Sequence, residues 1–392
     1  MKSNKIVAAI NAVFIFLVIN YSIFVRFIIG FDSVGYGLSL LSVIVFLINF
    51  HDFERLQLSK PVLFWLIWCL YAFVNYYIHP QPKPMSIWVL YRRVFVPLIT
   101  MTVVIKEYQN NSNKLLWLCF ITHAAYMVLG VYFDTGIIYR NEEIDNELGN
   151  NYAIVSSFTL FYLVLLNRLR KISVIWSIVI IVIAMIVLSM AGTRKAFGAC
   201  IIIICFWIYS IIQRRNVLTW ILVGAFAFIG MKGYNALLEN TYMGARMDAL
   251  QEQQAEQLPS GAPEFLSIFG DRATHYYYGW KTFKRHPLFG EGTGQSMVGS
   301  SVSYVHSEYM SQLSDGGIVG FLLFSLFIIW MIKHILRQWH NDREIIRCIM
   351  GGMVAILFMY FTTWGWEFPQ YFMCFGVIIG YCKMGKPIVE SR

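Results

Sequence analysis

The stretch HPLFGEGTGQSMVGSSVSYVHSEYMSQLSDGG occupies residues 286–317, and IVGFLLFSLFIIWMIKHILR follows it directly at 318–337. The first stretch gathers glycine, serine, histidine and acidic residues, whereas isoleucine, leucine and phenylalanine dominate the second. A helix of about 20 apolar residues is long enough to cross the hydrocarbon core of a membrane. The junction therefore predicts a polar segment at a membrane surface that leads straight into a transmembrane helix.

The composition extends this prediction to the whole chain. Of the 392 residues, 58% are hydrophobic and 14% are charged, while soluble proteins average about 25% charged residues. The net charge is +9, but lysine and arginine are scattered between apolar runs, which indicates loops that orient membrane spans rather than a nucleic-acid surface. The seven cysteines lie in or beside apolar runs, so we expect buried thiols and no disulfide framework.

Twelve apolar segments are long enough to be membrane-spanning helices. The chain is therefore predicted to be an all-α polytopic membrane protein with about 12 transmembrane helices and one large helical segment on the outer side. Spans one to nine fall in residues 1–238, the outer segment in 239–315, and spans ten to twelve in 316–392. The first span has no cleavage site, so we expect it to be retained. The predicted spans are 6–29, 34–50, 60–78, 93–106, 114–133, 151–167, 172–190, 195–212, 217–238, 316–338, 345–363 and 365–382.

The lysine and arginine content of the short loops predicts the orientation, because cytoplasmic loops are enriched in these residues. Placing both termini in the cytoplasm puts the acidic loop RNEEIDNELGN, 140–150, and the segment 239–315 on the outer side of the membrane. The cations that then lie on the cytoplasmic side are Arg168, Arg170, Lys171, Arg214, Arg215, Lys333, Arg337, Arg343, Arg347, Lys383 and Lys386.

Three sets of cations depart from this rule, because they fall at the outer edge of the membrane. One explanation is pairing with anionic lipid headgroups, and another is an anionic substrate held at that edge. Since three sets lie on the same predicted side, we favour the substrate. The sets are Arg92 with Arg93, Arg194 with Lys195, and Arg246 with Arg272, Lys281, Lys284 and Arg285.

Two surface helices are predicted in the outer segment, at 239–258 and at 272–286. Each ends directly before a proline, as helices tend to do. In the second helix, four aromatic residues are spaced to form one face, which suits either the membrane interface or contact with sugar rings. They are Tyr276, Tyr277, Trp280 and Phe283.

The glycine-rich GEGTG at 290–294 follows no predicted strand, so it indicates a sharp backbone bend rather than a nucleotide site. The sequence contains no GxxxxGK[ST], HExxH or DxD motif, which argues against an ATPase, a zinc protease and a metal-dependent transferase. We therefore expect neither a metal ion nor a cofactor.

The stretch VHSEYMSQLSDGG predicts a helix that is capped by Ser303. Helical spacing puts His306 and Glu308 on different faces, with Gln312 beside Glu308, so we do not expect a His306–Glu308 pair. A neutral imidazole at the outer membrane face could accept the proton of an attacking hydroxyl, which makes His306 the candidate general base. Asp315 is expected to cap the span that follows.

Four segments together resemble the bacterial O-antigen ligase and polymerase superfamily. In that superfamily a tryptophan-bearing helix leads into HPLFGxG, and an HxxY segment leads into an acidic residue and a glycine-rich start of a span. This chain has HSEY where many relatives have HNEY, and the resemblance covers residues 145–320. The segments are GWKTFKRHPLFGEGTGQ (279–295), HSEYMSQLSDGGIVGFLLF (306–324), LSMAGTRKAFGA (188–199) and GNNYAIVSSFTLFYLVLL (149–166).

The resemblance implies a glycosyltransferase of the C-type architecture, which moves a glycan from undecaprenyl pyrophosphate to an acceptor sugar hydroxyl at the periplasmic face without a metal. The functional arginines of the family correspond to Arg194 and Arg272, which would hold the pyrophosphate, and its histidine corresponds to His306. These are the predicted catalytic residues. The predicted contacts with pyrophosphate or glycan are Arg246, Arg92, Arg93, Trp280, Tyr277, Glu308 and Tyr309.

Three functions remain open at this point. A polymerase would join lipid-linked repeat units of O-antigen or capsule, with a chain-length regulator as a further partner. We favour it because nothing in the compact outer segment marks a docking surface for lipid A-core, the acceptor that a ligase would use for the finished glycan. A flippase for lipid-linked glycan should show inverted repeats or broken spans in matching positions, which the sequence lacks.

Overall fold

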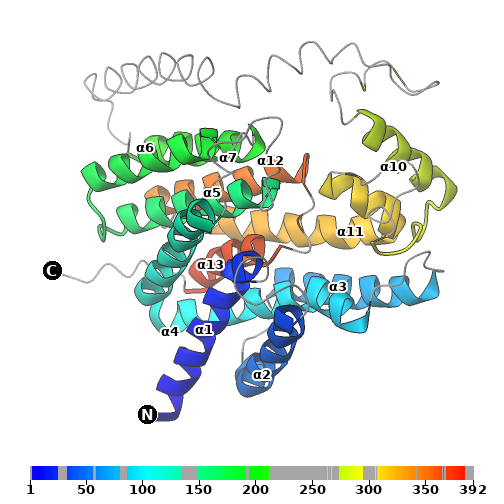
Figure 1. The fold of residues 1–392 in the computed structure, drawn as a ribbon, viewed down its shortest axis with the longest axis horizontal. Coiled ribbons are helices and arrows are strands. Elements are labelled where there is room, and N and C mark those ends of the chain that lie inside the picture. Colours follow the sequence, from blue (N-terminus) through cyan, green and yellow to red (C-terminus); the bar gives the residue numbers. More distant parts are fainter. Residues whose placement is uncertain are drawn as a thin grey trace.

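The structure is a computed structural model, and its described part is built from helices, without strands (Figure 1). It describes residues 2–24, 33–55, 59–79, 86–133, 149–190, 194–211, 263, 266, 273–294, 305, 307–340, 342–363, 365 and 368–384. The helices are α1 (Lys2–Ile23), α2 (Ser33–Arg55), α3 (Lys60–Ile78), α4 (Ile87–Phe133), α5 (Gly149–Arg168), α6 (Val174–Met190), α7 (Arg194–Ile211), α10 (Ala273–Arg285), α11 (Glu308–Arg337), α12 (Arg343–Tyr360) and α13 (Pro369–Met384).

Every predicted span within the described residues coincides with a helix, and the predicted span 217–238 lies outside them. The predicted spans 93–106 and 114–133 lie on either side of a kink in α4. The kink is at Asn111, whose φ of −159° and ψ of 87° are not helical, so that α4 consists of two helices that meet there.

The outer segment is described only in part. The second predicted surface helix is confirmed as α10, which ends at Arg285, just before Pro287. The first predicted surface helix, 239–258, lies outside the described residues.

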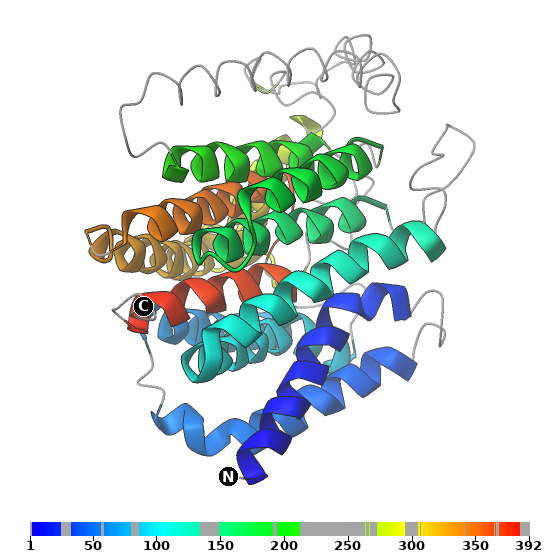
Figure 2. The ribbon, with the colours of Figure 1, turned by 90° about the vertical axis from the view of Figure 1, so that its left-hand side faces the viewer.

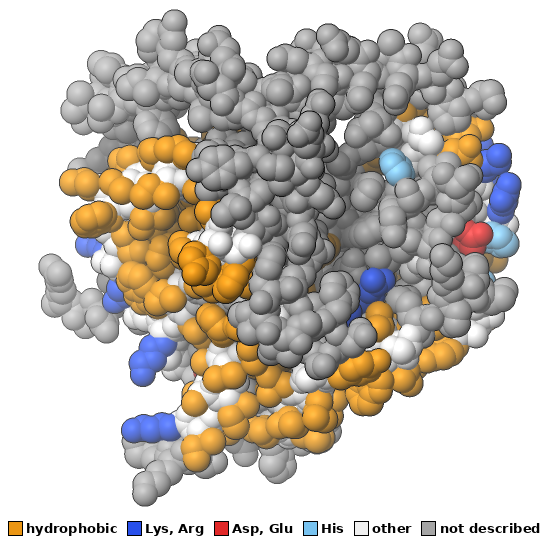
Figure 3. Space-filling model, in the orientation of Figure 1, with side chains coloured by type: hydrophobic (Ala, Val, Ile, Leu, Met, Phe, Trp, Pro, Cys, Tyr) orange, Lys and Arg blue, Asp and Glu red, His pale blue; other side chains and the backbone are white. Residues whose placement is uncertain are grey.

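Within the described residues, four helices are long and apolar enough to cross a membrane. Hydrophobic side chains cover much of the described surface in Figure 3, and lysine and arginine lie mainly at its edges. Such a surface suits lipid rather than water. The protein is therefore an all-helical membrane protein, while the number of twelve spans stays a prediction. The four helices are Lys5–Ile23, Lys60–Ile78, Ile87–Phe133 and Glu308–Arg337.

The helices stack in layers, and α13 lies in the interior of the stack (Figures 1 and 2). Figure 2 shows α6 and α7 at one end of the stack, α1 and α2 at the other, and α13 beside α4 between them. Aromatic contacts fix α13 on both sides. The ring of Phe372 lies 4.6 Å from that of Trp65 in α3, and the ring of Tyr371 lies 5.2 Å from that of Phe158 in α5.

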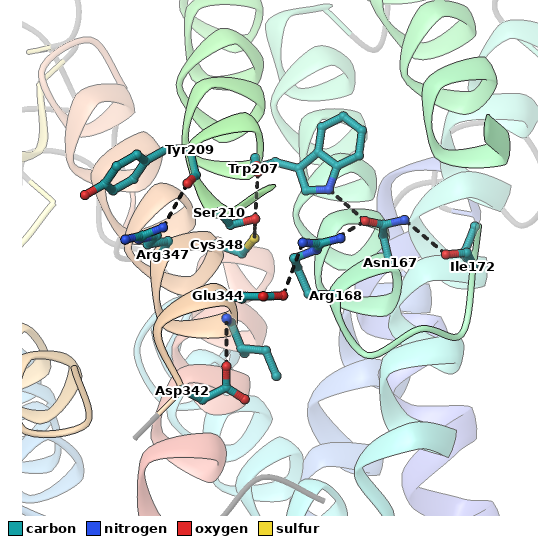
Figure 4. A network of polar contacts seen from close by, with 11 residues as sticks. Asn167, Arg168, Ile172, Trp207, Tyr209, Ser210, Asp342, Glu344, Arg347 and Cys348 are labelled. Carbon is teal, nitrogen blue, oxygen red and sulfur yellow. Dashed lines mark hydrogen bonds and ion pairs between the residues drawn. The ribbon is translucent and has the colours of Figure 1, made fainter. Parts of the chain in front are cut away.

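A polar network joins the ends of α5, α7 and α12 (Figure 4). Arg168 Nη1 lies 3.2 Å from Glu344 Oε2, and the side chain of Asn167 accepts a hydrogen bond from the indole N–H of Trp207 (2.9 Å). Burial raises the pKa of Asp342, whose carboxylate accepts a hydrogen bond from a backbone amide in the first turn of α12. Helix ends that the sequence assigns to the cytoplasm thus meet in one place, and the orientation itself stays a prediction.

The start of α11 differs from the sequence prediction. The N-cap is Ser307, whose backbone is extended (φ −148°, ψ 128°) and whose hydroxyl accepts a hydrogen bond from the Met310 amide at 3.5 Å. The predicted cap at Ser303 is therefore wrong, because the helix begins only at Glu308. The helix is then broken at Gly317, whose φ of 60° and ψ of −161° suit glycine and strain other residues.

A loop supplies the cap for the part of α11 that continues beyond this break. The backbone amides of Ile318 and Val319 donate hydrogen bonds to the carbonyls of Pro287 (2.9 Å) and Leu288 (3.2 Å). These amides open the continuing helix and would otherwise lack acceptors. The prediction that Asp315 caps this span is wrong, because loop carbonyls take the role that was assigned to its side chain.

The loop is also held by hydrogen bonds in the opposite direction. The amides of Glu291 and Gly292 donate to the carbonyls of Ser314 (2.9 Å) and Asp315 (3.1 Å). The carboxylate of Asp315 turns back to the loop and accepts a hydrogen bond from the Gly294 amide (3.1 Å). We call this pair of segments, 287–292 and 314–319, the backbone clasp.

Glycine is required where the two segments of the clasp touch. Gly290, Gly292 and Gly294 have φ values of 71°, 114° and 81°, which confirms the predicted bend at GEGTG. A Cβ atom on Gly290 would overlap the backbone carbonyl of Asp315, and one on Gly317 would lie 2.5 Å from the carbonyl oxygen of Leu288. The two chains therefore approach too closely for side chains.

Two polar side chains of helix α3 donate hydrogen bonds to the clasp. The Tyr71 hydroxyl donates to the carbonyl of Gly316 (2.6 Å), and the amide of Asn75 donates to the carbonyl of Asp315 (2.9 Å). Both side chains also reach the carbonyl of Phe289 in the loop, at 3.2 Å. The clasp thus satisfies backbone groups that the break in α11 leaves open.

Replacing Gly290 with alanine should disrupt the clasp, because the added Cβ overlaps α11 and the φ of 71° becomes strained. We expect the free energy of unfolding to fall by about 2 kcal/mol or more. This loss should be seen as a lower midpoint of thermal unfolding in detergent. Gly37→Ala is the matched control, since a Cβ on Gly37 in α2 meets no atom within 4 Å and alanine favours a helix. Equal midpoints for the two variants would contradict the clasp.

Candidate active site

The turn between α12 and α13, of which the structure describes residues 361–363, 365 and 368, is the point where three distant elements meet. The carbonyls of three successive residues, 361–363, accept hydrogen bonds from side chains and backbone of other helices. The donors are the Tyr276 hydroxyl of α10, Lys195 Nζ of α7 (3.3 Å) and the backbone amide of Glu308 in α11 (3.1 Å), in that order. Three elements that are far apart in sequence are thus fixed to one short turn.

Each of these donors is a close sequence neighbour of a predicted catalytic residue. Arg194 directly precedes Lys195 and is the first residue of α7, although its side chain lies outside the described part. Arg272 directly precedes α10, and His306 directly precedes the N-cap of α11; both lie outside the described residues. In sequence, Lys195 is one residue from Arg194, Glu308 is two residues from His306, and Tyr276 is four residues from Arg272.

Glu308 ties the first turn of α11 to the α12–α13 turn. Its side chain is fully buried, and its two carboxylate oxygens accept hydrogen bonds from Gln312 Nε2 (2.7 Å) and from the backbone amide of Gly365 (2.5 Å). The predicted shared face of Glu308 and Gln312 is confirmed. The Trp68 indole N–H donates to the carbonyl oxygen of Gln312 (2.7 Å), which fixes the orientation of that amide.

The residues around this contact are closely packed. A Cβ atom on Gly365 would overlap the ring of Tyr360, so the turn can pass Glu308 only with glycine at this position. The hydroxyl of Tyr309 donates to the carbonyl of Leu357 in α12 (3.1 Å). Glu308 and Tyr309, both predicted to contact substrate, are therefore engaged with protein groups in this structure.

A cavity of about 220 Å³ lies next to the end of the α12–α13 turn, between α1, α2, α4, α5 and α13. Arg92 and Arg93 of α4 line it, as do Phe368, Pro369 and Gln370 at the start of α13. Two of the residues that were predicted to contact substrate thus face one cavity. Its wall is the same turn that contacts the neighbours of the predicted catalytic residues.

Polar groups from three helices surround the two arginines. Arg92 Nη1 donates a hydrogen bond to the Tyr21 hydroxyl of α1 (2.5 Å), and its guanidinium lies 5.1 Å from the centre of that ring. The hydroxyls of Ser22 and Tyr126 are hydrogen-bonded at 2.9 Å. Gln370 is 7% exposed, and its Oε1 atom has no hydrogen-bond partner among the residues that the structure describes.

Trp280 of α10 lies at the surface. Trp280 is 44% exposed, and Lys284 Nζ lies 5.5 Å from the centre of its ring. Tyr277 contacts Tyr278 edge to face at 5.4 Å. Arg246 lies outside the described residues. The roles of these residues in substrate binding stay predictions.

Sequence reasoning missed the α12–α13 turn and the cavity beside it. The segment TTWGWEFPQ, 362–370, was treated only as a separator of two spans, although a glycine and a proline between apolar runs do indicate a turn. No local signal marks Tyr21 or Gln370, because their significance depends on helices that are distant in sequence. Among the described residues, no group of three or more His, Cys, Asp or Glu side chains is placed to hold a metal ion.

Replacing Glu308 with alanine should destabilise the site, because the Gly365 amide and the Gln312 side chain would lose a charged acceptor in a buried place. We expect the free energy of unfolding to fall by about 3 kcal/mol, measured by thermal unfolding in detergent. Glu344→Ala is the matched control, since the Glu344 side chain is 43% exposed in its ion pair and such pairs contribute less than about 1 kcal/mol. A smaller effect at Glu308 than at Glu344 would argue against the proposed contact.

Comparison with known proteins bears on the same elements. Residues 178–325 match a protein family described as O-antigen ligase, and no curated protein matches the chain. The matched segment contains α7, α10 and the first half of α11, which are the elements fixed to the α12–α13 turn. The resemblance that the motifs indicated is thus confirmed. Over residues 178–325, the chain is similar to this O-antigen ligase family, whose members are glycosyltransferase-like enzymes.

Proposed function

We propose that this protein is an inner-membrane polysaccharide polymerase. It transfers an undecaprenyl-pyrophosphate-linked glycan to an acceptor sugar hydroxyl at the periplasmic face and so extends O-antigen or capsule chains. The observation that supports this proposal is the convergence on the α12–α13 turn. The neighbours of Arg194, Arg272 and His306 all contact it within three successive residues.

The reaction needs a leaving-group site and a proton acceptor. The acceptor hydroxyl attacks the anomeric carbon of the donor, and the bond from that carbon to the pyrophosphate oxygen breaks. The bonding electrons leave with the pyrophosphate, and His306 takes the hydroxyl proton. Arg194 and Arg272 meet the charge that develops on the leaving oxygen, so they stabilise the transition state more than the bound donor.

The position of Arg194 suits this role. It is the first residue of α7, and the N-terminus of a helix favours bound anions. Lys195, hydrogen-bonded to the α12–α13 turn, holds the start of the helix in place. The donor already carries an activated sugar–diphosphate bond, so the reaction needs no nucleotide.

A ligase that transfers the finished glycan to lipid A-core is the second candidate, and the description of the matched family favours it. The glycan ladder on a gel separates the two activities. Cells that lack a polymerase produce lipid A-core with a single repeat unit. Cells that lack a ligase produce bare core while long chains accumulate on the lipid carrier. Cells that lack a flippase produce neither glycan on the core nor long chains on the lipid carrier.

His306→Ala should abolish most transfer while the protein stays folded and still binds the donor, because only the proton acceptor is removed. We expect the rate to fall by about 100-fold or more, measured as chain length in cells and as initial rate with purified protein. His340→Ala, at an exposed histidine after α11, is the control and should retain the wild-type ladder. Unchanged chain lengths in the His306 variant would remove this residue from the mechanism.

Arg194→Lys should also lose most glycan transfer, although the charge is kept, because a lysine cannot provide the planar, bidentate contact of a guanidinium group. We expect the turnover rate to fall by about 100-fold, with folding retained in size-exclusion chromatography. Arg337→Lys at the exposed end of α11 is the matched control. Activity of the Arg194 variant close to wild type would exclude the pyrophosphate contact.

A further inference from the structure

The cavity that Arg92 and Arg93 line adjoins the α12–α13 turn. Turn residues 361–363 and 365 contact α7, α10 and α11, whereas Phe368 and the first residues of α13 form part of the wall of the cavity. The two regions are therefore neighbours that share one turn. A ligand in the cavity would lie beside the catalytic region rather than within it.

The cavity offers guanidinium groups to an anion. Two adjacent arginines line it, and the described residues that line it include no carboxylate. Tyr21 holds Arg92 by a hydrogen bond and a ring contact, so its guanidinium is oriented before any ligand arrives.

A second observation also points to a ligand. Gln370 is more than nine-tenths buried in the cavity wall, and its Oε1 atom has no partner among the described residues. Leaving a buried polar atom without a hydrogen bond is costly. A ligand that carries a hydroxyl as well as anionic oxygens would satisfy this acceptor together with the arginines.

The size of the cavity limits the ligand. Its volume is about 220 Å³, below the range of roughly 300–1,000 Å³ that holds drug-sized ligands. A diphosphate group with the first atoms of an attached sugar fits this space, and a glycan chain does not. Guanidinium groups bind such phosphate oxygens in bidentate fashion.

We propose that Arg92 and Arg93 hold the diphosphate of the acceptor substrate, an inference that rests on the proposed polymerase function. When lipid-linked units are joined, both substrates carry a polyprenyl diphosphate, but only the donor releases it. The departing diphosphate belongs with Arg194 and Arg272, so the acceptor needs a second anion site. The sugars of its repeat unit then pass the α12–α13 turn and present their hydroxyl to His306.

The test uses the purified full chain in phosphatidylcholine nanodiscs with a labelled lipid-linked donor. One acceptor is the repeat unit on a short polyprenyl diphosphate, and the other is the same repeat unit as an alkyl glycoside without phosphate. Arg92→Gln and Arg93→Gln should each raise the KM for the diphosphate acceptor about tenfold or more. The KM values for the donor and the alkyl glycoside should stay within about twofold of wild type. Arg337→Gln is the control and should change none of them.

Binding of farnesyl diphosphate gives a second readout that does not depend on turnover. Calorimetry should show two binding sites per wild-type chain and one in the Arg92→Gln, Arg93→Gln double variant. In the arginine variants, a raised KM for the donor, or an equal rise of KM for both acceptors, would overturn the acceptor site alone. So would an effect that needs phosphatidylglycerol in the nanodiscs, because the cavity would then hold a phospholipid headgroup. If the wild-type protein transfers to neither acceptor, the proposed polymerase function itself is wrong.

Discussion

The backbone clasp between residues 287–292 and the broken helix α11 is the contact on which the rest of the site depends. A break in a helix at membrane depth exposes amide and carbonyl groups that lipid cannot satisfy. Here the amides of Ile318 and Val319 find acceptors in the loop, and the loop amides find acceptors in the helix. The polar stretch that interrupts an apolar sequence therefore has a structural purpose, which is to let α11 bend without leaving backbone groups unpaired.

The bend places the first turn of α11 against the α12–α13 turn. Glu308 then reaches the Gly365 amide with one oxygen and the Gln312 amide with the other. The same turn also accepts hydrogen bonds from Lys195 and from α10, so a local backbone contact positions three elements at once. In the proposed mechanism this gathers leaving-group and acceptor functions around one rigid turn, as catalysis by orientation requires.

Much of this architecture could be read from sequence, because apolar helices and glycine bends leave local signals. The helices, α10 and the bend at GEGTG were all predictable in this way. The cap at Asp315 was predicted wrongly because the true acceptors are backbone carbonyls, which no side-chain pattern reveals. The cavity around Arg92 and Gln370 could not be predicted, since its walls come from five helices that only packing brings together.

The most direct test of the account is whether residues 194 and 306 lie together beside the α12–α13 turn. Cys205 is the exposed cysteine and the other six are buried, so Cys205→Ser provides a suitable background. In that background, Arg194→Cys and His306→Cys should be joined rapidly by a short bifunctional thiol reagent. Arg194→Cys paired with Arg337→Cys, at the far end of α11, should not be joined. Cross-linking of 194 to 337 but not to 306 would contradict the convergence on which the proposed mechanism depends.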